Sequence, residues 1–193
     1  MKNNFVTILD FGSSKITCMA ASKVSDAGDF VIKAVGQSNY NGFDDNAWYE
    51  PNTIKDAIEG AILQVEGKMK CTVKELYVGV PGAFTAVATS EASLTYRSKH
   101  KVDDNDVNEI VKKADIYGCG TDFTPLGGKP VYFIIDGAIK TTDAVGTIAS
   151  KLTGLVSFSY MKNYFKKTVS RALQSIGITN VTYFNVCDAQ AKY

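Results

Sequence analysis

The sequence predicts an α/β protein that carries a small inserted α+β unit. Three observations predict this fold class. The chain opens with three apolar runs separated by turn residues, and an amphipathic helix and a further apolar run come next. This regular pattern stops at Pro81-Gly82 and returns near Lys162. The segment between these two points therefore predicts a separate unit that is inserted into the first one.

Size and composition are those of an ordinary globular protein. The 193 residues are 45% hydrophobic and 21% charged, which disfavours disorder and fibrous structure. The formal net charge of +1 provides no strong basic field, so we expect no nucleic-acid partner. No apolar stretch reaches the length of about 20 residues that a membrane-spanning helix needs, and the first residues lack the pattern of a signal peptide. We therefore expect a cytoplasmic protein whose chain makes no direct membrane contact.

The first part of the chain predicts three strands, a loop, one helix and a fourth strand. The helix begins after Pro51, where Thr53 and Asp56 have the spacing of a capping box, and its apolar residues recur on one face. The polar stretch 37–46 before it predicts a loop. In chain order the predicted strands are Phe5–Leu9, Ile16–Ala21, Phe30–Gly36 and Glu75–Val80.

The inserted segment and the end of the chain predict a second set of elements. Acidic residues over 103–106 favour the start of a helix that runs from Asp104 to Tyr117. Glycines and a proline predict a loop over 118–128, and Gly177 predicts the end of a later helix. The other predicted elements are a long strand or hairpin over 83–96, strands Val131–Ile135, Leu155–Tyr160 and Val181–Val186, a helix over 165–176 and a helix start at Cys187.

Cysteine and histidine usage predicts neither a metal site nor a histidine-based catalytic centre. The four cysteines, Cys18, Cys71, Cys119 and Cys187, are scattered without the short paired spacings of zinc ligands. The single histidine, His100, lies in a polar stretch between two lysines. We expect free thiols and no catalytic residues.

One short segment has chemical promise as a phosphate-binding loop. It consists of Asp10, Gly12, Ser13, Ser14 and Lys15, with Phe11 between the first two. Glycine lets a backbone approach a phosphate closely, successive amides can bind an anion, and the serines add hydroxyl donors. The lysine offers positive charge to phosphate oxygens, and the aspartate can hold Mg²⁺ through water.

Taken alone, this segment favours a plain hairpin turn over a phosphate site, because tight turns use the same residue types. It lacks the spacing of a Walker P-loop. A strand and not a helix follows it, so it is not a dinucleotide-binding fingerprint either.

Segments along the rest of the chain favour the phosphate-loop interpretation. Several segments together resemble the FtsA family of bacterial cell-division proteins, within the superfamily of actin, Hsp70 and sugar kinases. The similarity runs in order along almost the whole chain and departs from the family pattern most clearly over 43–48. The matching segments are Ile8–Ile16, Val35–Ser38, Leu76–Gly82, Asp103–Val107, Tyr132–Gly137, Asp143–Gly146, Leu152–Val156 and Cys187–Ala191.

The resemblance implies a ribonuclease-H-fold lobe of the actin and Hsp70 type, with subdomain 1A formed by residues 1–82 and 162–193. It implies an inserted SHS2-like subdomain 1C at 83–161. Proteins of the family bind Mg-ATP between two lobes, and only the first phosphate loop is found here. We therefore expect a fragment that is not an enzyme and that binds no cofactor tightly by itself, its half-site being Asp10, Gly12, Ser13, Ser14 and Lys15.

The resemblance also implies protein partners. Other FtsA-like protomers and division proteins would contact the insert, through the helix Asp104–Tyr117 and the strand Val131–Ile135. The FtsZ contact and the membrane-targeting helix belong to family segments that this chain lacks, and the whole protein would sit on the inner face of the membrane at the septum. Two alternatives stay open: a pilus-assembly protein similar to PilM, and a sugar or acid kinase with the same opening loop.

Overall fold

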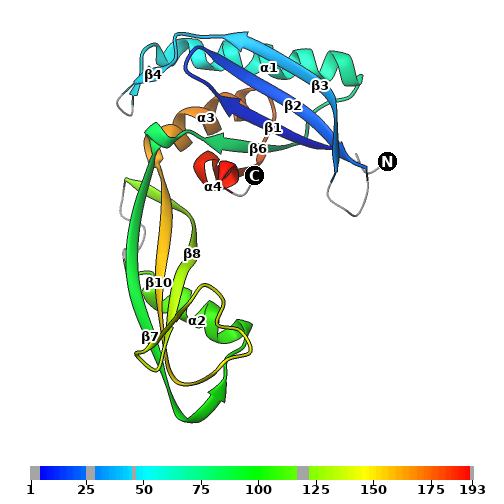
Figure 1. Cartoon of the computed structure of the whole chain (residues 1–193). Coiled ribbons are helices and arrows are strands. Elements are labelled where there is room, and N and C mark those ends of the chain that lie inside the picture. The colour runs from blue at the N-terminus through cyan, green and yellow to red at the C-terminus, as the bar shows by residue number, and fades with distance from the viewer. Residues whose placement is uncertain (1–4, 25–28, 45–46, 117–121, 192–193) are drawn as a thin grey trace. The chain divides into compact units, whose positions relative to one another are not determined.

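The computed structural model describes residues 5–24, 29–44, 47–116 and 122–191. Within it the chain forms two compact units. Unit 1 combines residues 1–85 with residues 161–193, and unit 2 consists of residues 86–160. The chain passes between the units along two strands, β7 on the way out and β10 on the way back (Figure 1).

Unit 1 is built on a five-stranded mixed sheet with the strand order β11-β6-β1-β2-β3. Strands β1, β6 and β11 are parallel to one another, whereas β2 is antiparallel to both β1 and β3. A two-residue pair, β4 with β5, lies outside this sheet. The bounds are β1 Val6–Phe11, β2 Lys15–Lys23, β3 Phe30–Asn39, β4 Phe43–Asp44, β5 Ala47–Trp48, β6 Glu75–Val80 and β11 Asn180–Asn185.

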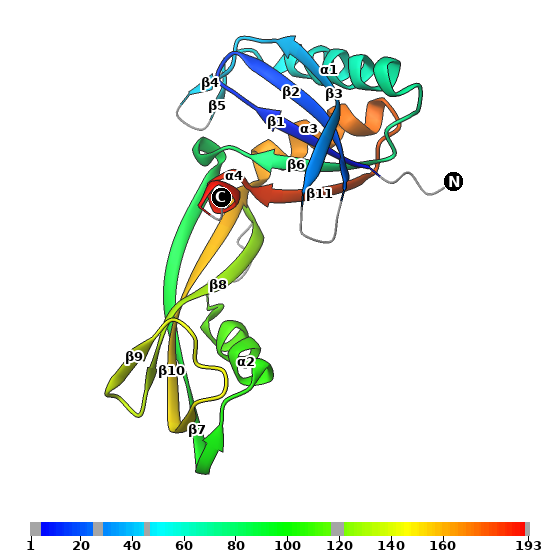
Figure 2. The ribbon, with the colours of Figure 1, turned by 45° about the vertical axis from the view of Figure 1, so that its right-hand side comes forward.

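Two helices, α1 (Ile54–Met69) and α3 (Asn163–Ser175), cover one face of this sheet (Figure 2). A Cβ on Gly36 of β3 would lie 2.1 Å from the carbonyl oxygen of Ala61 in α1, so glycine permits this close approach. The apolar stripe that predicted α1 is confirmed as its buried face: Ile54, Ala57, Ile58, Ala61, Ile62 and Val65. The last helix, α4 (Val186–Gln190), follows β11 directly.

An aromatic cluster lies between β1, α3 and the segment that precedes α1. The ring of Phe165 in α3 is 5.3 Å from Phe11 of β1 and 5.6 Å from Trp48, measured between centroids. The Trp48 ring also lies 4.6 Å from the tilted ring of Phe84, which in turn lies 5.1 Å from Phe43. Ring pairs at such distances are favourable beyond the apolar area that they bury. The cluster therefore ties residues 43–48 to the core of unit 1.

The start of α1 differs from its prediction. Thr53 does occupy the N-cap position, but its side chain accepts no hydrogen bond from the helix. Its Oγ1 donates instead to the carbonyl of Glu50 at 2.9 Å, across a short 3₁₀ turn over Pro51–Thr53. The predicted capping box is therefore wrong, because the preceding turn provides a competing local acceptor.

Unit 2 contains a four-stranded antiparallel sheet, in the order β7-β10-β8-β9, and one helix. Its core gathers buried apolar residues from β10 and α2, among them Leu152, Val156 and Ile110. The bounds are β7 Thr85–Lys101, α2 Asp104–Ala114, β8 Phe123–Ile135, β9 Ile139–Thr141 and β10 Ile148–Lys162.

The strands of unit 2 are longer than predicted, and α2 is shorter. Residues 123–128, expected in a loop, belong to β8, and β10 begins at Ile148. Gly128 does not mark a turn: a Cβ at this position would lie 2.4 Å from the ring of Phe158, so glycine makes room for that side chain. The helix ends at Ala114, and the predicted end at Tyr117 lies outside the described residues.

The predicted helix start at the acidic run is confirmed, and in the structure a capping box begins α2. Asp103 accepts hydrogen bonds from the amides of Asn105 and Asp106, and Asp106 Oδ2 accepts one from the amide of Asp103. The same Oδ2 lies 2.8 Å from Nε2 of His100. Burial raises the pKa of Asp106, but these hydrogen bonds outweigh burial and hold it below its ordinary value of 3.8.

We expect Asp106→Asn to lower the stability of unit 2 by about 1 kcal/mol at neutral pH, since a charged cap is lost. Because the folded pKa of Asp106 is lowered, its contribution is full above pH 3.8 and disappears as the pH falls further. Urea unfolding at several pH values measures this, with Asp104→Asn as the control because Asp104 is exposed in the same turn. Equal losses in both variants would contradict the assignment.

Candidate functional site

The segment that predicted a phosphate loop forms the tight hairpin between β1 and β2. Phe11 pairs with Ile16 across the hairpin, and the Gly12 amide donates to the Lys15 carbonyl at 3.0 Å. Ser13 and Ser14 form its tip and are exposed. The structure thus keeps the predicted loop residues together, at one end of the central strand of the sheet.

A second segment, which the sequence did not indicate as part of the site, holds this hairpin from the side. The hydroxyl of Tyr40 donates to the Gly12 carbonyl at 2.6 Å, and the Tyr40 amide donates to the Ser14 carbonyl at 3.1 Å. Burial, and then the charge of nearby Asp10, raises the pKa of Tyr40, so its hydroxyl stays protonated and can donate. The hairpin is therefore fixed through its carbonyl groups.

Gly42 completes this support. It adopts a positive φ of +75°, and a Cβ on it would lie 1.9 Å from the carbonyl oxygen of Ser13. Only glycine permits both the conformation and the contact without a shift of the backbone. The sequence signal was the Asn41-Gly42 pair, which is typical of turns but does not identify what the turn touches.

The groups at the tip of the hairpin are available to a ligand. Within the described ranges, no hydrogen bond engages the amide or the hydroxyl of Ser13 or Ser14. The ammonium of Lys15 is exposed and has no ion-pair partner among the same residues. Two successive free amides, two hydroxyls and one cation form an arrangement that can accept phosphate oxygens.

Asp10 lies next to the hairpin, near the carboxyl ends of the parallel strands β1, β6 and β11. Its carboxylate is exposed, and Oδ1 is 3.5 Å from the position of a Cβ on Gly79 in β6. A side chain at Gly79 would also come within 2.7 Å of Val186. Glycine thus keeps space open beside Asp10, at the end of the sheet where α/β proteins bind ligands.

The described residues around the hairpin do not form a complete metal site. In the part of the chain that the structure describes, no group of three or more histidine, cysteine or acidic side chains could hold a metal ion. Asp10 is a single carboxylate, which fits a Mg²⁺ ion that keeps most of its water. The residues present therefore fit an indirect metal contact and not a complete cage.

The described cysteines and the histidine do not belong to the hairpin. Cys18 is a buried residue of β2, and burial followed by the charge of Glu66 raises the pKa of its thiol to about 12. Cys71 and Cys187 are free thiols, while Cys119 lies outside the described residues. His100 is in unit 2, where it pairs with Asp106 and stacks on Tyr96 with ring centroids 4.4 Å apart.

Known proteins resemble this chain in sequence and in structure. No protein-family model matches the sequence. The cell-division protein FtsA of Streptococcus pneumoniae serotype 2 (strain D39 / NCTC 7466) is 27% identical over 176 residues, which cover 89% of this chain and 38% of that protein. A chain of the PilM-PilN type IV pilus biogenesis complex superposes with a TM-score of 0.52 and 13% identity, over 94% of this chain and 47% of that chain. A Bacteroides thetaiotaomicron protein with an actin-like ATPase fold and unknown function gives a TM-score of 0.41 at 3% identity.

The chain has the fold of one lobe of an actin-like ATPase, a mixed α/β sheet accompanied by a separate antiparallel sheet unit. It is distantly homologous to FtsA and structurally similar to PilM. It spans less than half the length of each of these two proteins. Among the helices of the described residues, none is long and apolar enough to cross a bilayer.

Proposed function

We propose that this chain is the part of an FtsA-like, actin-related cell-division scaffold that provides the first phosphate loop of its nucleotide site. The observation that carries the proposal is the β1–β2 hairpin, whose serine amides, serine hydroxyls and lysine are all free at the carboxyl end of a parallel strand. The distant homology to FtsA supports the same assignment. The antiparallel sheet unit occupies the place of an inserted subdomain, between β6 and α3.

Each group of the loop has a defined task in this proposal. The amides and hydroxyls of Ser13 and Ser14 donate to the terminal phosphate oxygens, and Lys15 neutralises their charge. Asp10 accepts hydrogen bonds from water bound to Mg²⁺, which neutralises and orients the phosphates when it is bound. Tyr40 takes no part in binding and fixes the loop through its hydrogen bond to the Gly12 carbonyl.

The site is half a cleft, so we expect affinity only when a second lobe closes it. A nucleotide on this hairpin alone leaves most of its surface in water, whereas ligand sites bury most of their ligand. The chain by itself is then a binding and scaffolding element without catalytic activity. In the complete protein, unit 2 would contact other FtsA-like protomers and division proteins, through the helix α2 and the strand β8.

Calorimetric titration with Mg-ATP tests the proposal on two proteins, this chain and the parent protein that includes a second lobe. We expect no saturable heat from this chain up to about 1 mM nucleotide, and binding by the parent protein that weakens at least about 100-fold in Asp10→Ala/Lys15→Ala. The control is Lys101→Ala/Asp104→Ala, which removes the same charges from exposed positions of unit 2. Unchanged binding in the first variant would exclude the hairpin as the phosphate site.

A PilM-like role in pilus assembly is the second candidate, and the superposition on a PilM-PilN chain favours it. Both roles use the same fold and the same loop, so the ATP experiment does not separate them. The two roles are separated by measuring the affinity of the parent protein for purified FtsZ and for a purified PilN-type peptide. Binding to FtsZ alone would support the division role, and binding to the PilN-type peptide alone would replace it with the pilus role.

A further inference from the structure

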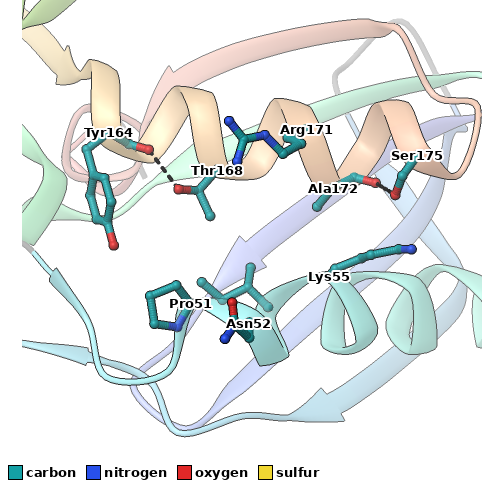
Figure 3. Close-up of a pocket in the computed structure, with 9 residues that line it drawn as sticks. Pro51, Asn52, Lys55, Tyr164, Thr168, Arg171, Ala172 and Ser175 are labelled. Atoms are coloured by element: carbon teal, nitrogen blue, oxygen red, sulfur yellow. Dashed lines mark hydrogen bonds between the residues drawn. The ribbon is translucent and has the colours of Figure 1, made fainter.

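A groove of about 490 Å³ opens in unit 1 between the first turn of α1 and the side of α3 that faces this turn (Figure 3). It is distant from the β1–β2 hairpin in sequence and shares none of its residues. Its floor is apolar, since Ile54 and Ala172 line it and are 1% and 6% exposed. An aliphatic side chain of a partner would bury apolar area on this floor.

The walls of the groove are polar and positively charged. Lys55 projects from α1 toward the end of α3 that carries Ala172 and Ser175, and Arg171 lies along α3 (Figure 3). Both side chains are exposed. The ring of Tyr164 extends from α3 toward Pro51 and closes one end of the groove.

The positive charge of this surface has no counterpart within the described residues. No carboxylate there forms an ion pair with Lys55 or Arg171, the two cations that line the groove. Asp56 and Glu59 of α1 do not line the groove. A partner that brings carboxylates would therefore meet cations that are not already neutralised.

The charge pattern of α3 itself opposes helix stability. The helix contains Lys166, Lys167 and Arg171 and has no acidic residue. Two of these cations lie near its N-terminal end, where the helix dipole disfavours positive charge, and Lys167 and Arg171 repel each other at the i, i+4 spacing. The repulsion between Lys167 and Arg171 therefore adds nothing to helix stability, whereas an anionic partner at Arg171 would offset it.

We propose that the α1–α3 groove binds an acidic peptide segment of a partner protein. Carboxylates of the peptide pair with Lys55 and Arg171, and an aliphatic side chain between them lies on the floor formed by Ile54 and Ala172. A bilayer does not fit, because the apolar floor lies at the bottom of a concave surface. Nucleic acid does not fit either, because the two cations that line the groove, Lys55 and Arg171, neutralise too few phosphates for stable binding.

Fluorescence polarisation tests this with a labelled short peptide made of glutamate, leucine and serine. We expect saturable binding that weakens at least about tenfold in Lys55→Glu/Arg171→Glu. A second peptide with glutamine in place of every glutamate should also bind at least about tenfold more weakly. In isotope-labelled protein, amide shift changes caused by the peptide should be confined to the first turn of α1 and to α3.

The matched control is Lys33→Glu/Lys74→Glu, which changes the net charge equally at exposed positions of unit 1 outside the groove. It should retain affinity within about twofold. Circular dichroism melts show whether each variant is folded. Equal weakening in both double variants, or binding of an anionic vesicle or of single-stranded DNA in preference to the peptide, would overturn the proposal. So would the absence of peptide binding up to about 1 mM.

Discussion

Phe165→Ala should destabilise unit 1 by about 3–5 kcal/mol, the largest single effect that we expect in this protein. Phe165 is completely buried, and its ring contacts Phe11, Trp48 and Phe84. Removal of the ring leaves a cavity in the middle of the aromatic cluster, so the loss combines transfer energy with lost packing. Urea or thermal unfolding followed by tryptophan fluorescence measures it, because Trp48, the single tryptophan of the chain, lies in the same cluster.

The neighbouring residue provides the control for this prediction. Tyr164→Ala makes a similar replacement in the same helix, but Tyr164 is 43% exposed. The intrinsic helix propensities of phenylalanine and tyrosine are close, so the two variants differ mainly in burial. We expect Tyr164→Ala to change stability by less than about 1 kcal/mol. Similar losses in the two variants would show that α3 and not the cluster determines the stability.

The aromatic cluster also shows where sequence reasoning reaches its limit. The segment 43–48 was interpreted as the end of a polar loop and as a departure from the family pattern. In the structure, Phe43 and Trp48 from this segment contact Phe84, about forty residues further along the chain. Periodicity describes a single helix or strand, and it carries no information on which rings meet across elements. The cluster could not be predicted for this reason.

Regular elements with strong local signals were predicted well. The buried stripe of α1 and the acidic start of α2 are local patterns, and both are confirmed. Strand β8 was predicted too short because Pro125, Gly127 and Gly128 were interpreted as turn residues. In β8, Gly128 leaves space for the ring of Phe158 on a neighbouring strand. Tertiary packing therefore overrides the local turn signal.

The candidate site shows the same difference between local patterns and contacts between distant residues. Asp10 to Lys15 form one continuous segment, so the sequence could bring them together, and the structure keeps them in one hairpin. The hydrogen bond from Tyr40 to Gly12 joins residues that are 28 positions apart. Nothing in the local pattern indicates such a contact. The groups that hold the loop were therefore missed, while the groups proposed to touch a ligand could be named because they share one continuous segment.

Gly42→Ala is the second large effect that we expect, because this substitution acts directly on the loop. The new methyl group would lie 1.9 Å from the Ser13 carbonyl oxygen, and the backbone φ of +75° is itself unfavourable for alanine. We expect a loss of about 2–5 kcal/mol in the stability of unit 1, as overpacking adds to backbone strain. The amide signals of Ser13 and Ser14 should shift strongly in NMR spectra, because the hairpin must move away from residue 42.

Gly177→Ala separates the two causes of this loss. Gly177 lies in the same unit, at the end of α3, and has a similar φ of +84°, but a Cβ there meets no atom within 4 Å. It should therefore show only the backbone penalty of about 1–2 kcal/mol and leave the hairpin signals unchanged. If both variants lose the same stability and neither moves the signals of Ser13, then residue 42 does not support the loop. If only Gly42→Ala moves them, the contact between Gly42 and Ser13 holds the hairpin in the arrangement that leaves its amides free for phosphate.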